Sequence, residues 1–317
     1  MKIVVTELMW PAGLGLLRTS GPTLYDDRLF RLRPRLLSHL EDCQALVVRN
    51  QTQVDQELLA AAPALKVVGR LGVGLDNLDL VTLGQRAIVV VSAGNTNATS
   101  VAEYALAAML VLARRLISAD ASTRAGAWDR AGHTGTELHG KTLGLIGLGD
   151  VGARVARRAS ALGMRLLAFD PALTPTHLAA AEFGVQLLPL EDVLRQSDFI
   201  SLHVPLTQAT RHLMNRASLA LVRPTAYLIN TSRGGVVDEA ALAAALRDRR
   251  LAGAALDVRE IEPPGADDPL AGLENVLLTP HVAGLTQEAQ DRTCTAVAQD
   301  VLRVLDGQPP VFAVNRQ

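Results

Sequence analysis

One stretch, residues 141–170, limits the possible fold of this chain more than any other. Within it, a short apolar run at 143–146 leads into a Gly-x-Gly-x-x-Gly motif at 147–152, and an apolar helical pattern follows. A second apolar run then ends at Asp170. The predicted order is strand, glycine turn, helix, strand and acid, which is the order that a dinucleotide-binding site needs.

Each glycine of this motif has its own task in a dinucleotide site. Gly147 permits a tight turn, Gly149 lets the backbone approach a pyrophosphate, and Gly152 lets the helix pack closely on the strand. The free N–H groups at the start of the helix would then face the phosphates. Glycines also occur in ordinary structural turns, so the flanking strands and the acid are what favour the nucleotide interpretation.

Asp170 discriminates between the two nicotinamide cofactors. At the end of the second strand, its carboxylate can accept hydrogen bonds from the ribose hydroxyls of the adenosine half. It would repel a ribose 2′-phosphate, and no Arg or Lys occurs at positions 171–174. The sequence therefore predicts NAD rather than NADP as the cofactor.

The composition is ordinary for a soluble globular protein. The chain has 317 residues, of which 49% are hydrophobic and 20% charged, and its net charge is −1. This balance gives no electrostatic reason to expect nucleic acid or a membrane as a partner. Because Cys43 and Cys294 are the only cysteines, we expect no disulfide framework, no metal site and a cytoplasmic location. The longest apolar stretch, 104–113, is too short to span a bilayer, and the first residues have no signal-peptide layout.

Apolar patterns predict two series of alternating strands and helices. The first series has strands at 3–5, 45–49, 65–69 and 88–91, with helices at 29–40, 54–62 and 78–86. The glycine motif begins only after this series, although a dinucleotide-binding fold normally opens with it. We therefore predict an α/β fold of two doubly wound parallel-sheet domains. A Rossmann NAD domain, 99–283, would be inserted into a flavodoxin-like substrate domain, 1–98 and 284–317, with long helices at 99–118 and 286–305.

Reactive side chains follow three predicted strands of the second series. Arg233 comes after the first of these strands (226–230), Asp257 lies at the end of the second (253–258) with Glu262 just beyond it, and His281 comes after the third (275–278). In open parallel sheets, ligands bind beyond the carboxyl ends of the strands. We therefore expect one guanidinium, two carboxylates and one imidazole where a nicotinamide ring would lie.

These residue types suit hydride transfer to a carbonyl group. The transfer leaves negative charge on the carbonyl oxygen, and His281 is the predicted proton donor because imidazole titrates near working pH. Glu262 on the other ring nitrogen would fix the tautomer and favour the imidazolium form. Arg233 would hold a substrate carboxylate or polarise the carbonyl.

Each of these residues also has a structural interpretation. His281 could belong to a turn, Glu262 could be a solvated loop acid, and Arg233 could cap a helix or pair with Asp238. Only their joint position at strand ends favours catalysis. Five further histidines lack such neighbours, and we expect a structural role for His133, His139, His177, His203 and His212.

Taken together, the motifs resemble those of the D-isomer-specific 2-hydroxyacid dehydrogenases. The matching segments are 67–77, 100–104, 140–149, 230–239 and 279–284. The resemblance implies NAD(H), an inserted cofactor domain and an active site of Arg233, Glu262 and His281. It also implies that the N–H groups of Val73 and Gly74 bind the substrate carboxylate, and that members form dimers through the helix matching 99–118. The cofactor contacts that it implies, beyond Arg233 and the three glycines, are Asp150, Val151, Asp170, Val204, Thr231, Ser232, Asp257, His281 and Gly284.

Within this family, the segments 70–77 and 137–142 are most similar to the phosphoglycerate and hydroxypyruvate branch and its sulfolactate relatives. Arg49 and Arg70 could bind a distal phosphate or sulfonate, or could be cations at the edge of the core. Asn50 follows Arg49 where phosphoglycerate enzymes commonly have Ser. The chain ends soon after the 286–305 pattern, so we expect no C-terminal regulatory domain.

The expected activity is NAD-dependent interconversion of a small D-2-hydroxy acid and its 2-keto acid. Glycerate and hydroxypyruvate, 3-phosphoglycerate and sulfolactate are the candidate substrates, and the sequence names neither one of them nor the direction. The alternative is a non-catalytic NAD-sensing dimer like the corepressors that share this fold. A formate-type dehydrogenase is disfavoured because that branch pairs its His with Gln, whereas Glu262 matches here.

Overall fold

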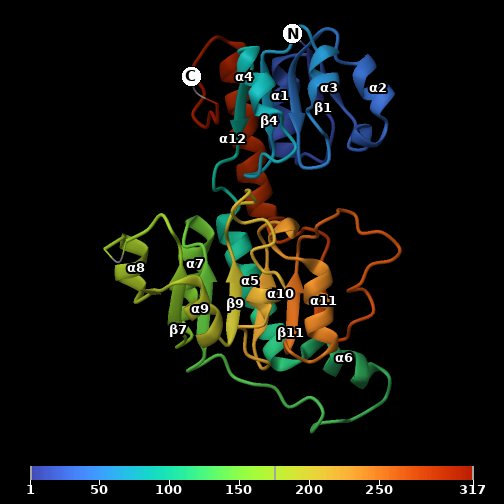
Figure 1. Ribbon diagram of the computed structural model, residues 1–317. Coiled ribbons are helices and arrows are strands. Elements are labelled where there is room, and N and C mark those ends of the chain that lie inside the picture. The colour runs from blue at the N-terminus through green and yellow to red at the C-terminus, as the bar shows by residue number, and fades with distance from the viewer. Residues whose placement is uncertain (1, 175, 316–317) are drawn as a thin grey trace. The chain divides into compact units, whose positions relative to one another are not determined.

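The computed structural model describes residues 2–174 and 176–315, and their contacts divide into two compact units. The first unit comprises the described residues of Met1–Asn97 and Leu285–Gln317, and the second is Ala98–Gly284. In each unit, helices flank a twisted sheet (Figure 1). The α/β class predicted from the sequence is confirmed.

The first unit contains a parallel sheet whose order, within the described residues, is β2-β1-β3-β4-β5. This is the flavodoxin-like order of a doubly wound sheet. The strands are β1 (Lys2–Val5), β2 (Thr23–Tyr25), β3 (Cys43–Val48), β4 (Val67–Arg70) and β5 (Val89–Ser92).

Two groups of helices cover the two faces of this sheet. Because side chains alternate along a strand, Ile3 and Val5 pack in one core and Val4 packs in the other. The first core includes α1 (Pro11–Ser20) and α12 (Gln287–Leu305). The second core includes α2 (Arg33–Ser38), α3 (Gln56–Ala60) and α4 (Leu80–Gln85).

Two helical segments of this unit differ from the sequence prediction. The helix expected over 29–40 is a 3-10 turn, η1 (Leu29–Arg31), followed by α2, because Pro34 fits only the first turn of a helix. Helix α1 was not predicted from the sequence, because its glycines obscure the helical pattern. Gly13 has a packing reason, since a Cβ there would lie 2.3 Å from the backbone oxygen of Cys294 on α12.

The second unit contains a parallel sheet of order β12-β11-β10-β9-β6-β7-β8 within the described residues. Counted from β6, this is the Rossmann order 3-2-1-4-5-6 with one further strand, and the order reverses between β6 and β9. The predicted pair of doubly wound sheets is therefore confirmed. The strands are β6 (Thr142–Ile146), β7 (Arg165–Phe169), β8 (Gln186–Leu187), β9 (Phe199–Leu202), β10 (Tyr227–Asn230), β11 (Gly253–Leu256) and β12 (Val276–Leu278).

Helices pack on both faces of this second sheet as well. Small residues of α5 (Ala98–Arg114), among them Ala102 and Ala105, form one core with α7 (Asp150–Ala161). The helix predicted over 99–118 ends at Arg114, because Arg115 adopts φ +53° and a separate helix begins after it. The remaining helical elements are α6 (Leu116–Arg124), α8 (Leu178–Phe183), α9 (Leu190–Gln196), α10 (Arg216–Leu219), the 3-10 turn η2 (Gly234–Val236) and α11 (Glu239–Arg247).

Among the described residues, no helix is both long enough and apolar enough to cross a membrane. The same residues contain no group of three or more His, Cys, Asp or Glu side chains arranged to hold a metal ion.

Candidate active site

The glycine motif forms the turn between β6 and α7. Gly147 has φ +93°, in the left-handed region, and a Cβ there would lie 2.7 Å from the backbone oxygen of His203. A Cβ at Gly152 would lie 2.3 Å from the backbone oxygen of Gly147. At Gly149, the residue before α7, a Cβ would meet no described atom within 4 Å. The turn therefore excludes side chains at its first and third glycines and leaves open space at the second, as close approach of a pyrophosphate requires.

Asp170 lies directly after β7 and is tied to the glycine turn. One carboxylate oxygen accepts a hydrogen bond from the Leu148 N–H (2.9 Å), and the other accepts one from the Ala172 N–H (3.0 Å). Asp170 is partly exposed, so further acceptor capacity remains for ribose hydroxyls. The acid is thus fixed beside the turn that it would serve in NAD binding.

Thr231 supplies a buried hydroxyl at the end of β10. Its Oγ1 has no hydrogen-bond partner within the described part of the chain. The loop around it is nonetheless ordered by Asn230, which accepts from Ser232 N–H (3.0 Å) and donates to the Arg233 backbone oxygen (2.9 Å). Buried polar groups rarely stay unpaired without a reason. An unpaired hydroxyl near a strand end fits a contact to a bound cofactor, which the family resemblance implies for Thr231 and which stays a prediction.

The other predicted cofactor residues are distributed around the same strand ends. Asp150 and Val151 open α7, and Asp150 forms an ion pair with Arg154 (2.6 Å). Val204 follows β9 and lies close to Gly147, since a Cβ on that glycine would be 3.0 Å from its side chain. Gly284 ends the second unit. Cofactor contacts at these positions stay predictions.

His203 follows β9 under the glycine turn. Its N–H donates to the Ile146 backbone oxygen (2.8 Å), and its Nε2 lies 2.9 Å from the Ser201 hydroxyl. Desolvation lowers the pKa of His203 from 6.5 to about 4. The ring is therefore neutral at physiological pH and supports the turn that the cofactor would contact.

We expect this partly buried histidine to make the fold sensitive to acid. The unfolded ring takes a proton below about pH 6.5, while the folded ring resists it down to about pH 4, so stability should fall as pH drops through this window. NMR titration of the His203 ring should give a pKa near 4, and His203→Gln should remove the signal and flatten the acid limb of the stability curve. Titration of that signal near 6.5 would contradict the account.

His281 and Glu262 form a hydrogen-bonded pair. The His281 Nδ1 lies 2.8 Å from Glu262 Oε2, and the exposed fractions of the two side chains are 37% and 24%. The other carboxylate oxygen, Oε1, accepts from the Arg259 N–H (3.0 Å). Because a carboxylate only accepts, Nδ1 carries the ring proton, and Nε2 is the atom left for exchange with a substrate.

The surroundings of Glu262 keep its carboxylate ionised. Burial acts to raise the pKa of Glu262, but the hydrogen bond and charge of His281, the Arg259 N–H and the charge of Arg233 together outweigh it. The net effect lowers the pKa of Glu262. The pair therefore combines an ionised carboxylate with an imidazole whose Nδ1 is hydrogen-bonded to it.

Asp257 holds the turn that carries His281. The backbone of His281 has φ +56°, an uncommon conformation for a residue with a side chain, and its N–H donates to the Asp257 backbone oxygen (2.8 Å). The Asp257 carboxylate, with Asp257 1% exposed, accepts from the Val282 and Ala283 N–H groups, each at 2.8 Å. Asp257 thus stabilises this turn through its hydrogen bonds, and its cofactor contact stays a prediction.

Thr279 and Tyr104 extend this support, and sequence reasoning missed both. The Thr279 hydroxyl donates to Asp257 Oδ1 (2.6 Å) and lies 2.5 Å from the Tyr104 hydroxyl on α5. Burial raises the pKa of Tyr104, so the phenol stays protonated and can donate. Tyr104 and Thr279 belong to the segments 100–104 and 279–284 noted above, but they lie 175 positions apart and nothing in the sequence pairs them.

Arg233 lies between β10 and η2, in an extended backbone conformation. Its Nη1 donates to the Ser232 backbone oxygen (2.6 Å), and its charge contributes to the low pKa of Glu262. Asp238, the alternative partner considered from sequence, accepts from the Ala241 N–H (2.9 Å) and caps α11. The second unit therefore brings the guanidinium of Arg233 into the electrostatic range of the Glu262–His281 pair.

Arg49, in the first unit, is held by neutral groups. Its Nη2 donates to Gln290 Oε1 (2.6 Å), its Nε donates to the Leu8 backbone oxygen (3.2 Å), and its guanidinium lies 5.7 Å from the Trp10 ring centroid. Burial lowers the pKa of Arg49, which remains a cation. Glu7 fixes the loop beneath it by accepting from the Arg49 N–H (2.8 Å).

The other predicted substrate residues of the first unit lie near the end of β4. Arg70 is 7% exposed, and its Nη1 donates to the Leu71 backbone oxygen (3.1 Å). Val73 is 44% exposed, and Gly74 follows it in the same loop. Arg70 is thus a buried cation packed against its own loop, which is closer to the core-edge interpretation than Arg49 is.

Comparison with known proteins adds independent findings. Residues 106–283 match the family model for the D-isomer specific 2-hydroxyacid dehydrogenase, NAD binding domain. The chain is 44% identical to the (S)-sulfolactate dehydrogenase of Chromohalobacter salexigens over 303 residues, which cover 96% of this chain and 98% of the relative. It is 42% identical to the D-3-phosphoglycerate dehydrogenase of Archaeoglobus fulgidus over 315 residues, 99% of this chain and 59% of the relative. The chain thus spans little more than half the length of such phosphoglycerate relatives.

Solved structures agree with these matches. The TT0316 protein from Thermus thermophilus has a TM-score of 0.92 and 34% identity, covering 99% of this chain and 100% of that one. D-lactate dehydrogenase from Aquifex aeolicus, complexed with NAD and lactic acid, has a TM-score of 0.86 and 29% identity over 96% of each chain. The chain therefore belongs to the D-isomer-specific 2-hydroxyacid dehydrogenase family.

Proposed function

We propose that this protein is an NAD-dependent oxidoreductase that interconverts a small D-2-hydroxy acid and its 2-keto acid. The observation that carries the proposal is the hydrogen bond between His281 and an ionised Glu262, with Arg233 close enough to lower the pKa of that acid. These three groups follow strands of the unit that matches an NAD binding domain. In carbonyl reduction, His281 would be the proton donor, Glu262 the carboxylate that pairs with it, and Arg233 the cation that binds the substrate.

Each of the three side chains has a distinct task in this proposal. When bound, NAD(H) supplies or accepts the hydride. His281 gives a proton from Nε2 to the carbonyl oxygen during reduction and removes it during oxidation. Glu262 stabilises the imidazolium and fixes its tautomer, and Arg233 binds the carboxylate or carbonyl oxygen of the substrate.

The cofactor would be held by the second unit. The glycine turn and the start of α7 suit a pyrophosphate, and Asp170 suits the adenosine ribose. The unpaired hydroxyl of Thr231 would bond a polar group of the cofactor. These features support NAD, and Asp170 disfavours NADP.

The first unit would serve as the substrate domain. Backbone N–H groups of Val73 and Gly74 are proposed to bind the substrate carboxylate, and Arg49 to bind an anionic tail. Arg49 suits this task because Gln290 and Leu8 orient its guanidinium without neutralising its charge. Sulfolactate, 3-phosphoglycerate and glycerate with their keto forms are the candidates, in keeping with the names of the relatives. Arg70 is retained as a second, more deeply buried candidate.

A cytoplasmic homodimer is the proposed state of the protein. Large apolar side chains are exposed on α5 and α6, namely Leu110, Leu116 and Ile117, which suits burial against a second copy. Cys43 and Cys294 are both buried free thiols, as suits a reducing compartment. Neither nucleic acid nor a membrane is part of the proposal.

A substrate panel tests this function. Purified protein should reduce a 2-keto acid with NADH, and NADPH should be a poorer donor. The panel consists of hydroxypyruvate, 3-phosphohydroxypyruvate, 3-sulfopyruvate, glyoxylate and pyruvate.

Arg49→Ala should raise KM for the phosphorylated or sulfonated substrate by about 10-fold or more, since a charged hydrogen bond is worth about 1.5–3 kcal/mol.

The control for that variant is a keto acid without an anionic tail, such as glyoxylate, whose KM should change little. Equal effects on all substrates would overturn the role of Arg49, and preference for NADPH would overturn that of Asp170. Tight NADH binding without turnover of any 2-keto acid would favour the NAD-sensing alternative.

A further inference from the structure

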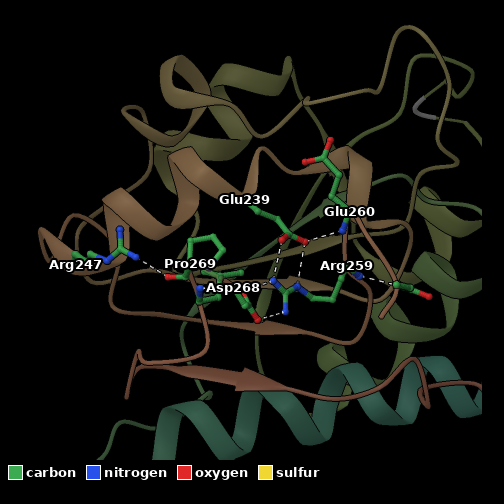
Figure 2. Close-up of polar contacts among 8 residues, drawn as sticks. Glu239, Arg247, Arg259, Glu260, Asp268 and Pro269 are labelled. Carbon is green, nitrogen blue, oxygen red and sulfur yellow. Dashed lines mark hydrogen bonds and ion pairs between the residues drawn. The ribbon is translucent and has the colours of Figure 1, made fainter. Parts of the chain in front are cut away.

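A buried ion cluster lies next to the catalytic pair and has no task in the proposed chemistry. Arg259 follows β11, and its side chain is 8% exposed. It forms ion pairs with Glu239, at the start of α11, and with Asp268. We call these three residues the Arg259 clamp (Figure 2).

The geometry of the clamp uses the full fork of an arginine. The Arg259 Nε and Nη2 donate to the two oxygens of Glu239 (3.1 and 2.8 Å), and Nη1 and Nη2 donate to the two oxygens of Asp268 (2.7 and 2.6 Å). The side chains of Glu239 and Asp268 are 13% and 7% exposed. Hydrogen bonds to both carboxylates raise the pKa of Arg259. A lysine has no planar fork and could not reproduce this pattern.

The main chain of Arg259 contacts the proposed catalytic residues. Its N–H donates to Glu262 Oε1, while Glu262 Oε2 faces His281. On the other side, a Cβ at Gly234 would lie 1.9 Å from the Arg259 carbonyl carbon, so the 259–260 peptide packs directly on the glycine that follows Arg233. The clamp therefore joins the loop of Glu262 to the loop of Arg233.

The loop of Glu262 is tied to α11 at one further point. The Glu260 N–H donates to Glu239 Oε1 (2.7 Å), the same oxygen that accepts from Arg259 Nε. Figure 2 shows Glu239 between Arg259 and the Glu260 backbone. The segment that presents Glu262 is thus held by α11 through both a side chain and a main-chain bond.

We propose that Arg259 is a positioning residue, whose side chain, clamped by Glu239 and Asp268, fixes its own main-chain N–H against Glu262 and so holds Glu262 on His281. This inference rests on the proposed function of the pair. A buried ion cluster adds little net stability compared with apolar residues of similar volume, so stability alone is a weak reason for the clamp. Placement of a catalytic group matters more, because displacement by about 1 Å can cost about 100-fold in rate.

The test compares Arg259→Lys and Arg259→Met with Arg247→Ala. Arg247 donates to the Pro269 backbone oxygen beside Asp268 and is a matched control outside the clamp (Figure 2). Arg259→Met should lower kcat by about 10- to 100-fold with KM for NADH and the keto acid changed less than about 2-fold. Arg259→Lys should retain part of the rate, and Arg247→Ala should retain all of it.

A second measurement needs neither cofactor nor substrate. In the cofactor-free protein, the His281 Nδ1–H proton should give an NMR resonance typical of a bond to a carboxylate, which Glu262→Ala removes. That resonance should be shifted or lost in the Arg259 variants and unchanged in Arg247→Ala. Arg259→Lys keeps the test valid if Arg259→Met does not fold.

Folded Arg259 variants with wild-type kcat and an unchanged His281 resonance would overturn the positioning role. So would equal losses in kcat and in NADH affinity, since these would indicate general damage to the unit. If the wild-type protein reduces no 2-keto acid, the proposed function fails, and the resonance alone then decides whether Arg259 holds the pair.

Discussion

Replacement of His281 by Ala is expected to lower kcat for 2-keto acid reduction by about 10²- to 10⁴-fold, the usual contribution of a positioned general acid. Among the described residues, His281 is the only imidazole that is hydrogen-bonded to the ionised Glu262, and the variant removes it. NADH affinity should fall far less than kcat, because the side chain acts on the carbonyl oxygen and the glycine turn lies elsewhere in the unit. Steady-state kinetics together with NADH fluorescence titration separate these two quantities.

His133→Ala is the matched control for that variant. His133 is a partly exposed histidine of the same unit, and its Nδ1 contacts only the Asp129 backbone oxygen (2.8 Å) among the bonds described. Its removal should leave kcat unchanged. A His281→Ala protein that folds and turns over at the wild-type rate would eliminate His281 as the proton donor.

The second large effect is expected at Gly149. A methyl group there would enter the open space at the start of α7, where a pyrophosphate would approach. Because hydrogen bonds to charged groups are worth about 1.5–3 kcal/mol, losing one should weaken NADH binding by about 10- to 100-fold. Titration of NADH into Gly149→Ala measures this loss directly.

The apo fold of Gly149→Ala should remain close to wild type. The residue has φ −70° and a Cβ would meet no described atom within 4 Å, so alanine fits without strain. Alanine makes the unfolded chain less flexible, which stabilises the fold by about 1 kcal/mol or less. Alanine also caps the helix less well than glycine, which costs a similar amount, so the two effects offset each other. Gly152→Ala is the contrast, since its Cβ would lie 2.3 Å from the Gly147 oxygen and should lower Tm as well as binding. Unchanged NADH affinity in folded Gly149→Ala would contradict a pyrophosphate at this turn.

Local and periodic features of the sequence predicted much of this architecture. The glycine motif specifies its own turn, because the left-handed conformation of Gly147 and the close contact at Gly152 are properties of those positions. Arg233, Glu262 and His281 each follow a strand. Because parallel strands finish at the same edge of a sheet, the sequence predicted that these residues lie in one unit. The pairing of His281 with Glu262 followed from chemistry as well as from place.

Features that depend on contacts between distant segments were not predictable. The glycines of α1 lower its helix propensity, and only packing on α12 explains Gly13. Arg259 finds one partner 20 positions earlier and another 9 positions later, with no motif to connect them. Asp257 was expected at a strand end, and the family resemblance implied its cofactor contact, but its bonds to the His281 turn required coordinates.

The most direct test of the central claim is a double-mutant cycle between His281 and Glu262, measured as kcat for 2-keto acid reduction. Because the carboxylate acts through the imidazole, His281→Ala combined with Glu262→Gln should be about as slow as His281→Ala alone. Losses that multiply in the double variant would show that the two residues act independently and would contradict the account.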